Sequence, residues 1–155
     1  MMRRAELEIS GIREEDVAQM AEIEKLSFSV PWSEQSIRDE LGAPLSRYFI
    51  ARKDGRVLGY VGTRILDGEC DITNIAVHPD FRRQGLAGIL LCELLSYLKE
   101  KNVTAVMLEV RESNVPARAF YEKSGFEYCG RRRNYYEKPD EDALLMILYP
   151  EGKTC

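Results

Sequence analysis

Apolar and polar residues along the chain follow two periodicities, one typical of strands and one typical of helices. Leu7 and Ile9 alternate with polar neighbours, which predicts a short first strand. Apolar residues then recur at helical spacing, at Val17, Met20, Ile23 and Leu26. The chain therefore begins with a predicted strand followed by a predicted helix.

A second helix is predicted over residues 31–42, PWSEQSIRDELG. Ser33 is a residue type that caps helix N-termini. Ile37 and Leu41 fall on one face, and Gly42 stands where helices commonly end. These features predict a short helix that ends at the glycine.

A tight hairpin is predicted over residues 47–66, RYFIARKDGRVLGYVGTRIL. Two apolar strands flank Asp54-Gly55, and both residue types tolerate the positive φ angles of a two-residue turn. The remaining predicted elements are strand 71–77, helix 85–101, strand 105–110, helix 116–125, strand 126–136 and strand 143–149. The fold class is therefore mixed α/β, in one domain spanning 1–150, and we expect 151–155 to be a frayed tail.

Composition excludes several other classes of protein. The 155 residues fit one domain, and 45% hydrophobic with 31% charged residues is ordinary for a globular protein. No apolar run approaches the roughly 20 residues of a membrane span, and the N-terminus lacks the apolar segment of a signal peptide. We therefore expect a cytoplasmic protein with no membrane partner. The net charge of −4 disfavours nucleic acid as the main partner and suits a basic peptide or an amine.

The four cysteines are far apart in the sequence, at Cys70, Cys92, Cys129 and Cys155. His78 is the single histidine, and no Cys/His group has the spacing of a zinc site. We therefore expect no bound metal and four reduced thiols, either buried or incidental.

The segment HPDFRRQGLAGILL, residues 78–91, lies between a predicted strand and a predicted helix. The first N–H groups of a helix lack partners within it, and this end carries a partial positive charge. Gly85 and the small Ala87 let a ligand approach the backbone, and Arg82 and Arg83 add positive charge. The segment predicts a site for a pyrophosphate-like anion. It is neither a P-loop nor a GxGxxG fingerprint, and from spacing alone a capped surface helix with two solvated arginines is an equal alternative.

The residue pattern adds a family resemblance. Residues 82–87, RRQGLA, match the R/Q-x-x-G-x-G/A acetyl-CoA signature of the GNAT superfamily of N-acetyltransferases, and they follow a predicted strand as that family requires. The signature permits Ala87 where many relatives have glycine. Together, NIAVHPDFRRQGLAGILL, LEVRESNVPARAFYEKSGF and RRRNYY resemble the RimI branch, the bacterial ribosomal-protein alanine N-acetyltransferases, over nearly the whole chain. The resemblance implies the GNAT fold, a mixed, largely antiparallel sheet of about seven strands flanked by about four helices.

The same resemblance implies acetyl-CoA as co-substrate. The backbone of Ile75, Ala76 and Val77 is expected to pair with the pantetheine arm as an added strand edge. The pyrophosphate is expected on the loop backbone, at Arg83, Gln84, Gly85, Leu86, Ala87 and Gly88. Asn114 is expected to contact the cofactor further along, although an asparagine here is also a good N-cap for the helix that follows.

Two side chains are candidates for the proton transfers of amide formation, since only a neutral amine can attack a thioester. Glu109 interrupts an apolar strand, where a partly buried carboxylate can act as a general base. The alternative is that strand alternation turns Glu109 to solvent or pairs it with Arg111. The resemblance implies Glu109 as proton acceptor and Tyr121 as proton donor, with Phe120 as the structural aromatic. We expect direct transfer in a ternary complex, and we disfavour a nucleophilic cysteine paired with His78, which precedes a proline in a predicted loop.

The acceptor side is less defined in the sequence. Tyr135 and Tyr136 follow the basic run 131–133, which suits either a peptide groove or a solvated strand end. Trp32 suits a cover for the same groove or a core position. The resemblance implies the N-terminal alanine of a small-subunit ribosomal protein as substrate, and we expect a monomer. The alternatives left open are a GNAT enzyme for lysine side chains, other protein N-termini or a small amine, an acetyl-CoA-binding regulatory module without turnover, and, least favoured, a nucleic-acid-binding module.

Overall fold

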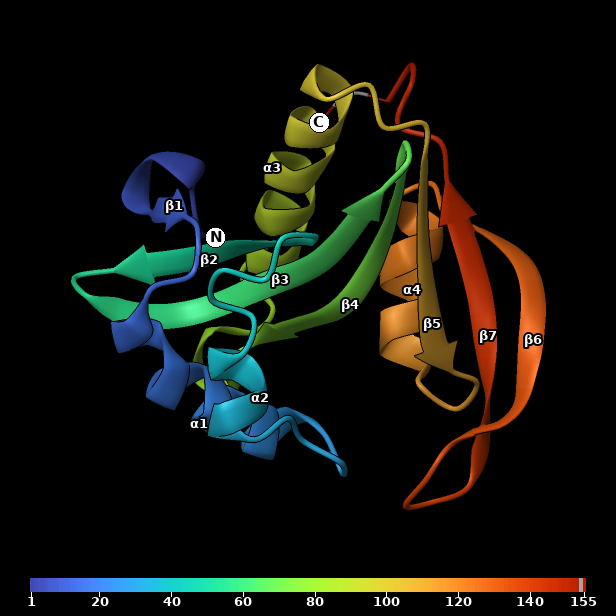
Figure 1. Ribbon diagram of the computed structural model, residues 1–155, viewed down its shortest axis with the longest axis horizontal. Helices are drawn as coiled ribbons and strands as arrows, with labels where there is room; N and C mark the ends of the chain where they lie inside the picture. The colour runs from blue at the N-terminus through green and yellow to red at the C-terminus, as the bar shows by residue number, and fades with distance from the viewer. Residues whose placement is uncertain (154) are drawn as a thin grey trace.

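The computed structural model describes residues 1–153 and 155, and it contains one sheet covered by helices on both faces (Figure 1). The strands are β1 (Glu8–Ser10), β2 (Ser46–Lys53), β3 (Arg56–Leu66), β4 (Glu69–Val77), β5 (Ala105–Arg111), β6 (Glu127–Tyr136) and β7 (Glu141–Leu148). The α-helices are α1 (Val17–Ser27), α2 (Glu34–Arg38), α3 (Leu86–Glu100) and α4 (Val115–Lys123). The architecture is the mixed α/β fold that the sequence predicts.

The strand order is β1-β2-β3-β4-β5-β7-β6, and β4 and β5 are its parallel neighbours. They pair only where Glu69–Asp71 face Ala105–Met107, and they diverge beyond that point. Figure 1 shows the two strands side by side at one end of the molecule and separated at the other. The sheet therefore opens in its middle, between a half built on β1–β4 and a half built on β5–β7.

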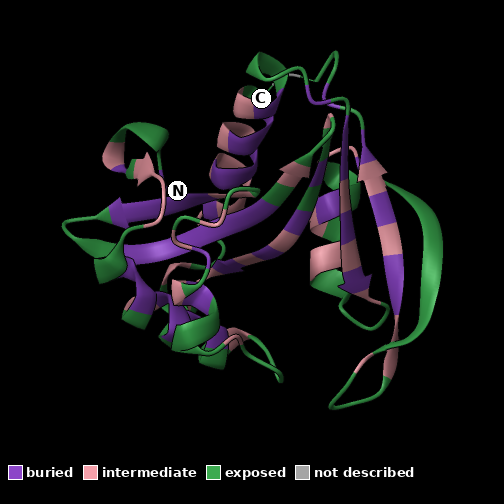
Figure 2. Cartoon of the chain, viewed as in Figure 1, coloured by how far each residue is buried: buried purple, intermediate pink, exposed green. Residues whose placement is uncertain are grey.

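The two faces of the sheet bury separate groups of apolar side chains. On one face, Met20 and Ile23 of α1 and Ile37 of α2 pack around Tyr60 of β3. On the other face, six leucines of α3 join the core, namely Leu86, Leu90, Leu91, Leu94, Leu95 and Leu98. Figure 2 shows buried residues along β2 and β3, whereas β6 is exposed over almost its whole length.

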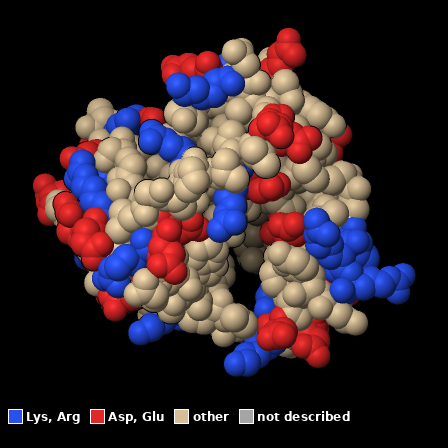
Figure 3. Space-filling view, in the orientation of Figure 1, with Lys and Arg blue, Asp and Glu red and all other residues tan. Residues whose placement is uncertain are grey.

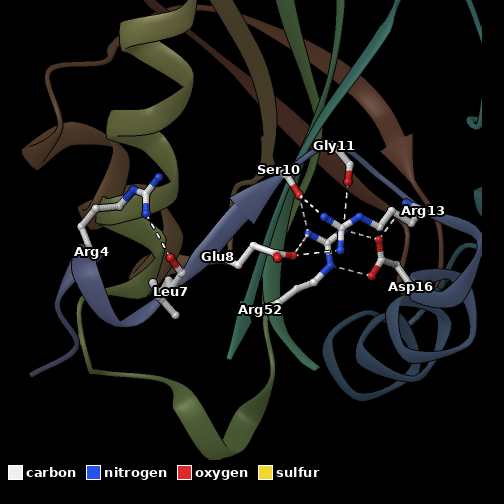
Figure 4. A network of polar contacts seen from close by, with 8 residues as sticks. All are labelled: Arg4, Leu7, Glu8, Ser10, Gly11, Arg13, Asp16 and Arg52. Atoms are coloured by element: carbon white, nitrogen blue, oxygen red, sulfur yellow. Dashed lines mark hydrogen bonds and ion pairs between the residues drawn. The ribbon is translucent and has the colours of Figure 1, made fainter. Parts of the chain in front are cut away.

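A buried ion pair fixes the start of α1 against the sheet. The Arg52 side chain of β2 donates from Nε to Asp16 Oδ1 at 2.8 Å and also bonds Ser10 and the carbonyl of Gly11 (Figure 4). Asp16 immediately precedes α1 and is buried. Removing one partner of such a pair would leave a buried charge without compensation. The contact therefore fixes the N-terminus of α1 against β2.

Helix α2 is shorter than predicted. Ser33 caps it as expected, accepting a hydrogen bond from the Ser36 amide at 3.1 Å. Beyond Arg38 the chain tightens into turns, in which the amide of Glu40 bonds the carbonyl three residues before it. The Glu40 carboxylate points inward and accepts from Ser46 Oγ at 2.6 Å, so the side chain anchors a turn rather than extending a helix. The prediction of helix as far as Gly42 is wrong by one turn.

The expectation of four reduced thiols is also wrong. Cys92 of α3 and Cys155 form a disulfide, with Cα atoms 5.8 Å apart and a sequence separation of 63. Cys70 is a free buried thiol, and Cys129 is free and exposed. Distance along the chain hid the pairing, because the fold returns the C-terminus to α3.

The predicted hairpin turn is present. Asp54 and Gly55 have φ angles of 52° and 77°, which are the left-handed values that the hairpin turn requires. No helix in the described part of the chain is both long and apolar enough to cross a membrane.

Candidate active site

Strand β4 presents a backbone edge to the opening of the sheet. On one side Ile75, Ala76 and Val77 pair with β3. On the other side the pairing with β5 stops at Asp71, so no strand of the described chain covers these residues. A free edge of this kind offers N–H and C=O groups to an extended, amide-bearing ligand.

A β-bulge lies where β4 leaves β5. Gly62 of β3 faces Asn74, but Thr63 faces Ile72, so Thr73 is an extra residue in β4. A bulge bends its strand and increases the local twist. The bulge therefore explains why the last four residues of β4 turn away from β5.

The edge leads directly into the N-terminus of the 15-residue helix α3. Gly85 is the N-cap at φ 83°, a left-handed conformation that favours glycine, and no side chain caps the helix. Arg83 also has a positive φ, of 62°. The first turn therefore keeps unpaired N–H groups at the positive end of the helix dipole, which suits an anion.

The two arginines of this loop have different surroundings. Arg82 donates from Nε to the carbonyl of Val77 and from Nη2 to Ser27 Oγ, each at 3.0 Å, so it braces the loop against β4 and α1. Arg83 is exposed. On the outer side, the Met2 amide bonds the carbonyl of Gln84 at 2.8 Å. Only Arg83 is therefore placed as a free charge beside the helix N-terminus.

Asn114 has the capping role that the sequence allows. Its side chain accepts a hydrogen bond from the Ala117 amide at 3.2 Å, at the start of α4. The cofactor contact expected for Asn114 stays a prediction.

Glu109 lies across the opening, on β5. Its side chain is 28% exposed and accepts a hydrogen bond from Arg132 Nε of β6 at 3.3 Å. The partner is thus not Arg111, the arginine that the sequence suggested. A half-exposed carboxylate with one weak ion pair remains available to a second donor.

Tyr121 points from α4 into the core beside β5. It is 6% exposed, and its ring makes edge contacts with Phe120 and Phe126. Burial, and secondarily the neighbouring Tyr136, raise the pKa of Tyr121, so the hydroxyl keeps its proton at neutral pH. Burial, and secondarily the Glu109 carboxylate, raise the pKa of Tyr136 to about 12.

Arg111 joins the two walls of the opening, a role that the sequence did not suggest. Its guanidinium donates to the carbonyls of Glu137 and Pro139 in the β6–β7 loop and to Ser29 Oγ at 3.4 Å in the loop between α1 and α2. It also lies 4.6 Å from the ring centroid of Tyr136. Figure 3 shows the surface hollowed over this opening, with charged side chains of both signs on its rim.

Within residues 1–153 and 155, no group of three Cys, His, Asp or Glu side chains is arranged to hold an ion. His78 instead accepts a hydrogen bond on Nδ1 from the Asp80 amide at 3.1 Å.

Comparisons with known proteins agree with this geometry. Residues 17–126 match the family described as acetyltransferase (GNAT) family. The chain is 38% identical over 144 residues to the [ribosomal protein bS18]-alanine N-acetyltransferase of Escherichia coli strain K12, covering 90% of this chain and 95% of that one.

Solved structures give the same result. The crystal structure of the ribosomal-protein-S18-alanine N-acetyltransferase from Escherichia coli has a TM-score of 0.86 at 34% identity, covering 96% of this chain and 99% of that one. Ard1 from Thermoplasma volcanium also has a TM-score of 0.86, at 28% identity, covering 93% of this chain and 97% of that one.

Proposed function

The chain belongs to the acetyltransferase (GNAT) family, and from that premise we propose that it transfers an acetyl group from acetyl-CoA to the N-terminal alanine of ribosomal protein bS18. The observation that carries the proposal is the placement of three features around one opening. These are the free edge of β4, the uncapped start of α3, and the partly exposed carboxylate of Glu109 on β5, the strand on the other side of the opening.

The residues present fit acetyl-CoA. The free backbone of Ile75, Ala76 and Val77 matches the amide groups of a pantetheine arm, and the residues from Arg83 to Gly88 offer unpaired amides to a diphosphate. No heavy atom lies within 4 Å of a Cβ added at Gly88, so this side of the first helical turn is open. Bound here, acetyl-CoA supplies an acetyl group already activated as a thioester.

We assign the general base to Glu109. A protonated amine has no lone pair with which to attack, so a proton must leave the acceptor nitrogen. The Glu109 carboxylate is half-exposed at the opening and has capacity for a further hydrogen bond, directly or through a water. A terminal α-amine, with a reference pKa of about 7.7–8.0, loses its proton more easily than a lysine at about 10.4.

We assign the general acid to Tyr121. Its raised pKa keeps the phenol protonated at neutral pH. As the C–S bond of the tetrahedral intermediate breaks, negative charge develops on the sulfur, and the phenol can donate its proton there so that coenzyme A leaves as the thiol. Tyr121 and Glu109 thus divide the two proton transfers, and direct transfer needs no covalent enzyme intermediate.

A mass measurement tests this function. Incubating the small-subunit ribosomal proteins with the enzyme and acetyl-CoA should add one acetyl group to the N-terminal fragment of bS18 and to no other fragment. Peptides with free and with blocked α-amines separate the lysine and small-amine alternatives. Binding of coenzyme A with no product on any acceptor would instead indicate a regulatory module.

A further inference from the structure

Glu24 is a buried carboxylate that neither proton transfer uses. It lies on α1 and is 1% exposed, and no ion pair among residues 1–153 and 155 includes it. The sequence already indicates that this position is unusual for a carboxylate. Glu24 follows Met20 by four residues and Val17 by seven, so helical spacing places it on the apolar face of α1. Burying a carboxylate without a cation is costly unless several donors satisfy it.

Three neutral donors from three separate segments satisfy this carboxylate. The Trp32 backbone amide donates to Oε1 at 2.9 Å. Tyr60 Oη of β3 donates to Oε2, and Asn74 Nδ2 of β4 lies 3.4 Å from the same oxygen. Burial, and secondarily Glu24 itself, raise the pKa of Tyr60, so this hydroxyl stays a donor. The carboxylate therefore connects the loop before α2 with the two strands.

Strand β3 leaves room for this contact. A Cβ added at Gly62 would stand 2.3 Å from Asn74 Oδ1 and 2.5 Å from the ring of Tyr48. Any side chain larger than hydrogen at Gly62 would push Asn74 from its place. The absence of a side chain there is thus an independent sign that the position of Asn74 matters to the fold.

Both ends of the connection lie at the proposed active site. Asn74 directly precedes Ile75, the first residue of the free β4 edge. Residues 28–33, which we call the α1–α2 loop, contact Arg111 of β5 through Ser29 and Glu24 through Trp32. The loop therefore spans the opening between β4 and β5, fixed to β5 at one point and to β4 at the other.

We propose that Glu24 is a positioning residue that sets the α1–α2 loop relative to β4, and thereby places the acceptor amine against the acetyl group. This inference rests on the acetyl transfer proposed above. A side chain in this role acts through Trp32 and Asn74 and touches neither substrate. Its loss should weaken the acceptor side of the reaction and leave the cofactor side intact.

Glu24→Gln keeps the volume but weakens the connection. With its oxygen toward the Trp32 amide, the new NH2 group can donate to the Tyr60 hydroxyl but opposes the NH2 group of Asn74, and in the reverse orientation it opposes the Trp32 amide. We expect the KM for a bS18 N-terminal peptide to rise roughly tenfold, the cost of one buried charged hydrogen bond, while the KM for acetyl-CoA stays within about twofold. The acidic limb of the kcat–pH profile should not move. Loss of that limb would make Glu24 the base, and an unchanged peptide KM would also overturn the proposal.

Amide exchange provides a readout that needs no activity. In Glu24→Ala the Trp32 amide has lost its acceptor, so its exchange should accelerate roughly tenfold or more. The chain has one tryptophan, so emission and acrylamide quenching report on this loop alone. Glu22→Ala, at an exposed position two residues earlier on α1, is the matched control.

The outcomes are separable. Unchanged protection of Trp32 in Glu24→Ala would refute the link even if the enzyme is active. Absence of acetyl transfer in the unmodified protein would refute the proposed function while exchange still decides the link. If Glu24→Ala unfolds, amides of β3 lose protection as well, and Glu24→Gln measured by exchange and quenching then decides the question.

Discussion

The two sides of the opening are built in different ways. On the β4–α3 side the ligand-facing groups are backbone, from Ile75–Val77 and from the amides that follow Arg83, and they come from one short stretch of chain. On the β5 side they are side chains, such as Glu109, Arg111 and Tyr136, and their partners lie far apart in sequence. A local motif can specify the first side, whereas only the whole fold assembles the second.

This difference predicts how each side responds to mutation. Single side-chain deletions should impair the β5 side strongly, because one functional group is lost with each. The same deletions on the β4–α3 side should matter little, unless they change the backbone conformation.

Glu109→Gln should reduce kcat by about 10²- to 10³-fold, because it removes the general base and keeps the side-chain shape. The dissociation constant for coenzyme A should stay within about twofold, since the cofactor side is backbone. Steady-state kinetics and calorimetry measure the two quantities.

Glu112→Gln is the matched control for that variant. Glu112 also pairs with an arginine of β6, Arg131, at 2.6 Å, but lies outside the proposed machinery. If both variants slow transfer equally, the contact with β6 is what matters and the assignment of Glu109 as base is lost.

Tyr121→Phe should lower kcat by roughly tenfold, less than the loss of the base, because a thiolate can leave without a proton donor, whereas a protonated amine cannot attack. The raised pKa of Tyr121 also predicts the pH dependence of kcat. Because the phenol keeps its proton as the pH rises, kcat of the unmodified enzyme should show no alkaline decline caused by this group up to about pH 10. Kinetics across pH check both expectations. Tyr128→Phe, whose hydroxyl bonds Arg118 on the outer surface, is the control and should change nothing.

The contrast between the two sides also explains which parts of the fold could be predicted from the sequence. The order of strands and helices followed from periodicity, because each element buries one face. Helix α2 ended early because Glu40 bonds Ser46, and the disulfide joins Cys92 to Cys155. Both are contacts between segments that no local pattern connects.

At the candidate site, too, local features could be predicted from the sequence and long-range contacts could not. The loop at Gly85 could be identified from a few adjacent residues, since the helix N-terminus supplies its chemistry. The partner of Glu109 could not, because alternation along β5 shows that Arg111 shares a face with it but not that Arg132 of β6 lies closer. Glu24 was recognisable only as a carboxylate on an apolar face, and its partners became clear from the fold.

Gly85→Ala should raise the dissociation constant for coenzyme A by about tenfold. The left-handed conformation at φ 83° costs a residue with a Cβ roughly 1–2 kcal/mol. The loop should therefore shift, and its N–H groups should no longer point at the diphosphate. Gly42→Ala imposes similar backbone strain at φ 76°, away from the opening and with nothing within 4 Å of the new Cβ, whereas a Cβ at Gly85 would also stand 2.9 Å from the flexible Met1 Sδ. Gly42→Ala should lower thermal stability without changing cofactor affinity. Equal affinities in the two variants would show that the backbone of the loop does not bind the cofactor.

Arg83→Ala should have the smallest effect, a rise of about two- to threefold in the dissociation constant for coenzyme A at moderate salt. Arg83 is exposed, so its attraction for a diphosphate is screened, while the amides and the helix dipole remain. The difference between variant and unmodified protein should shrink as ionic strength rises. Lys99→Ala removes the same charge at the far end of α3, about 20 Å away by helical rise, and should leave affinity unchanged. A loss far above tenfold in Arg83→Ala would mean that a side chain, rather than the backbone, provides the main contact, and the contrast between the two sides would fail.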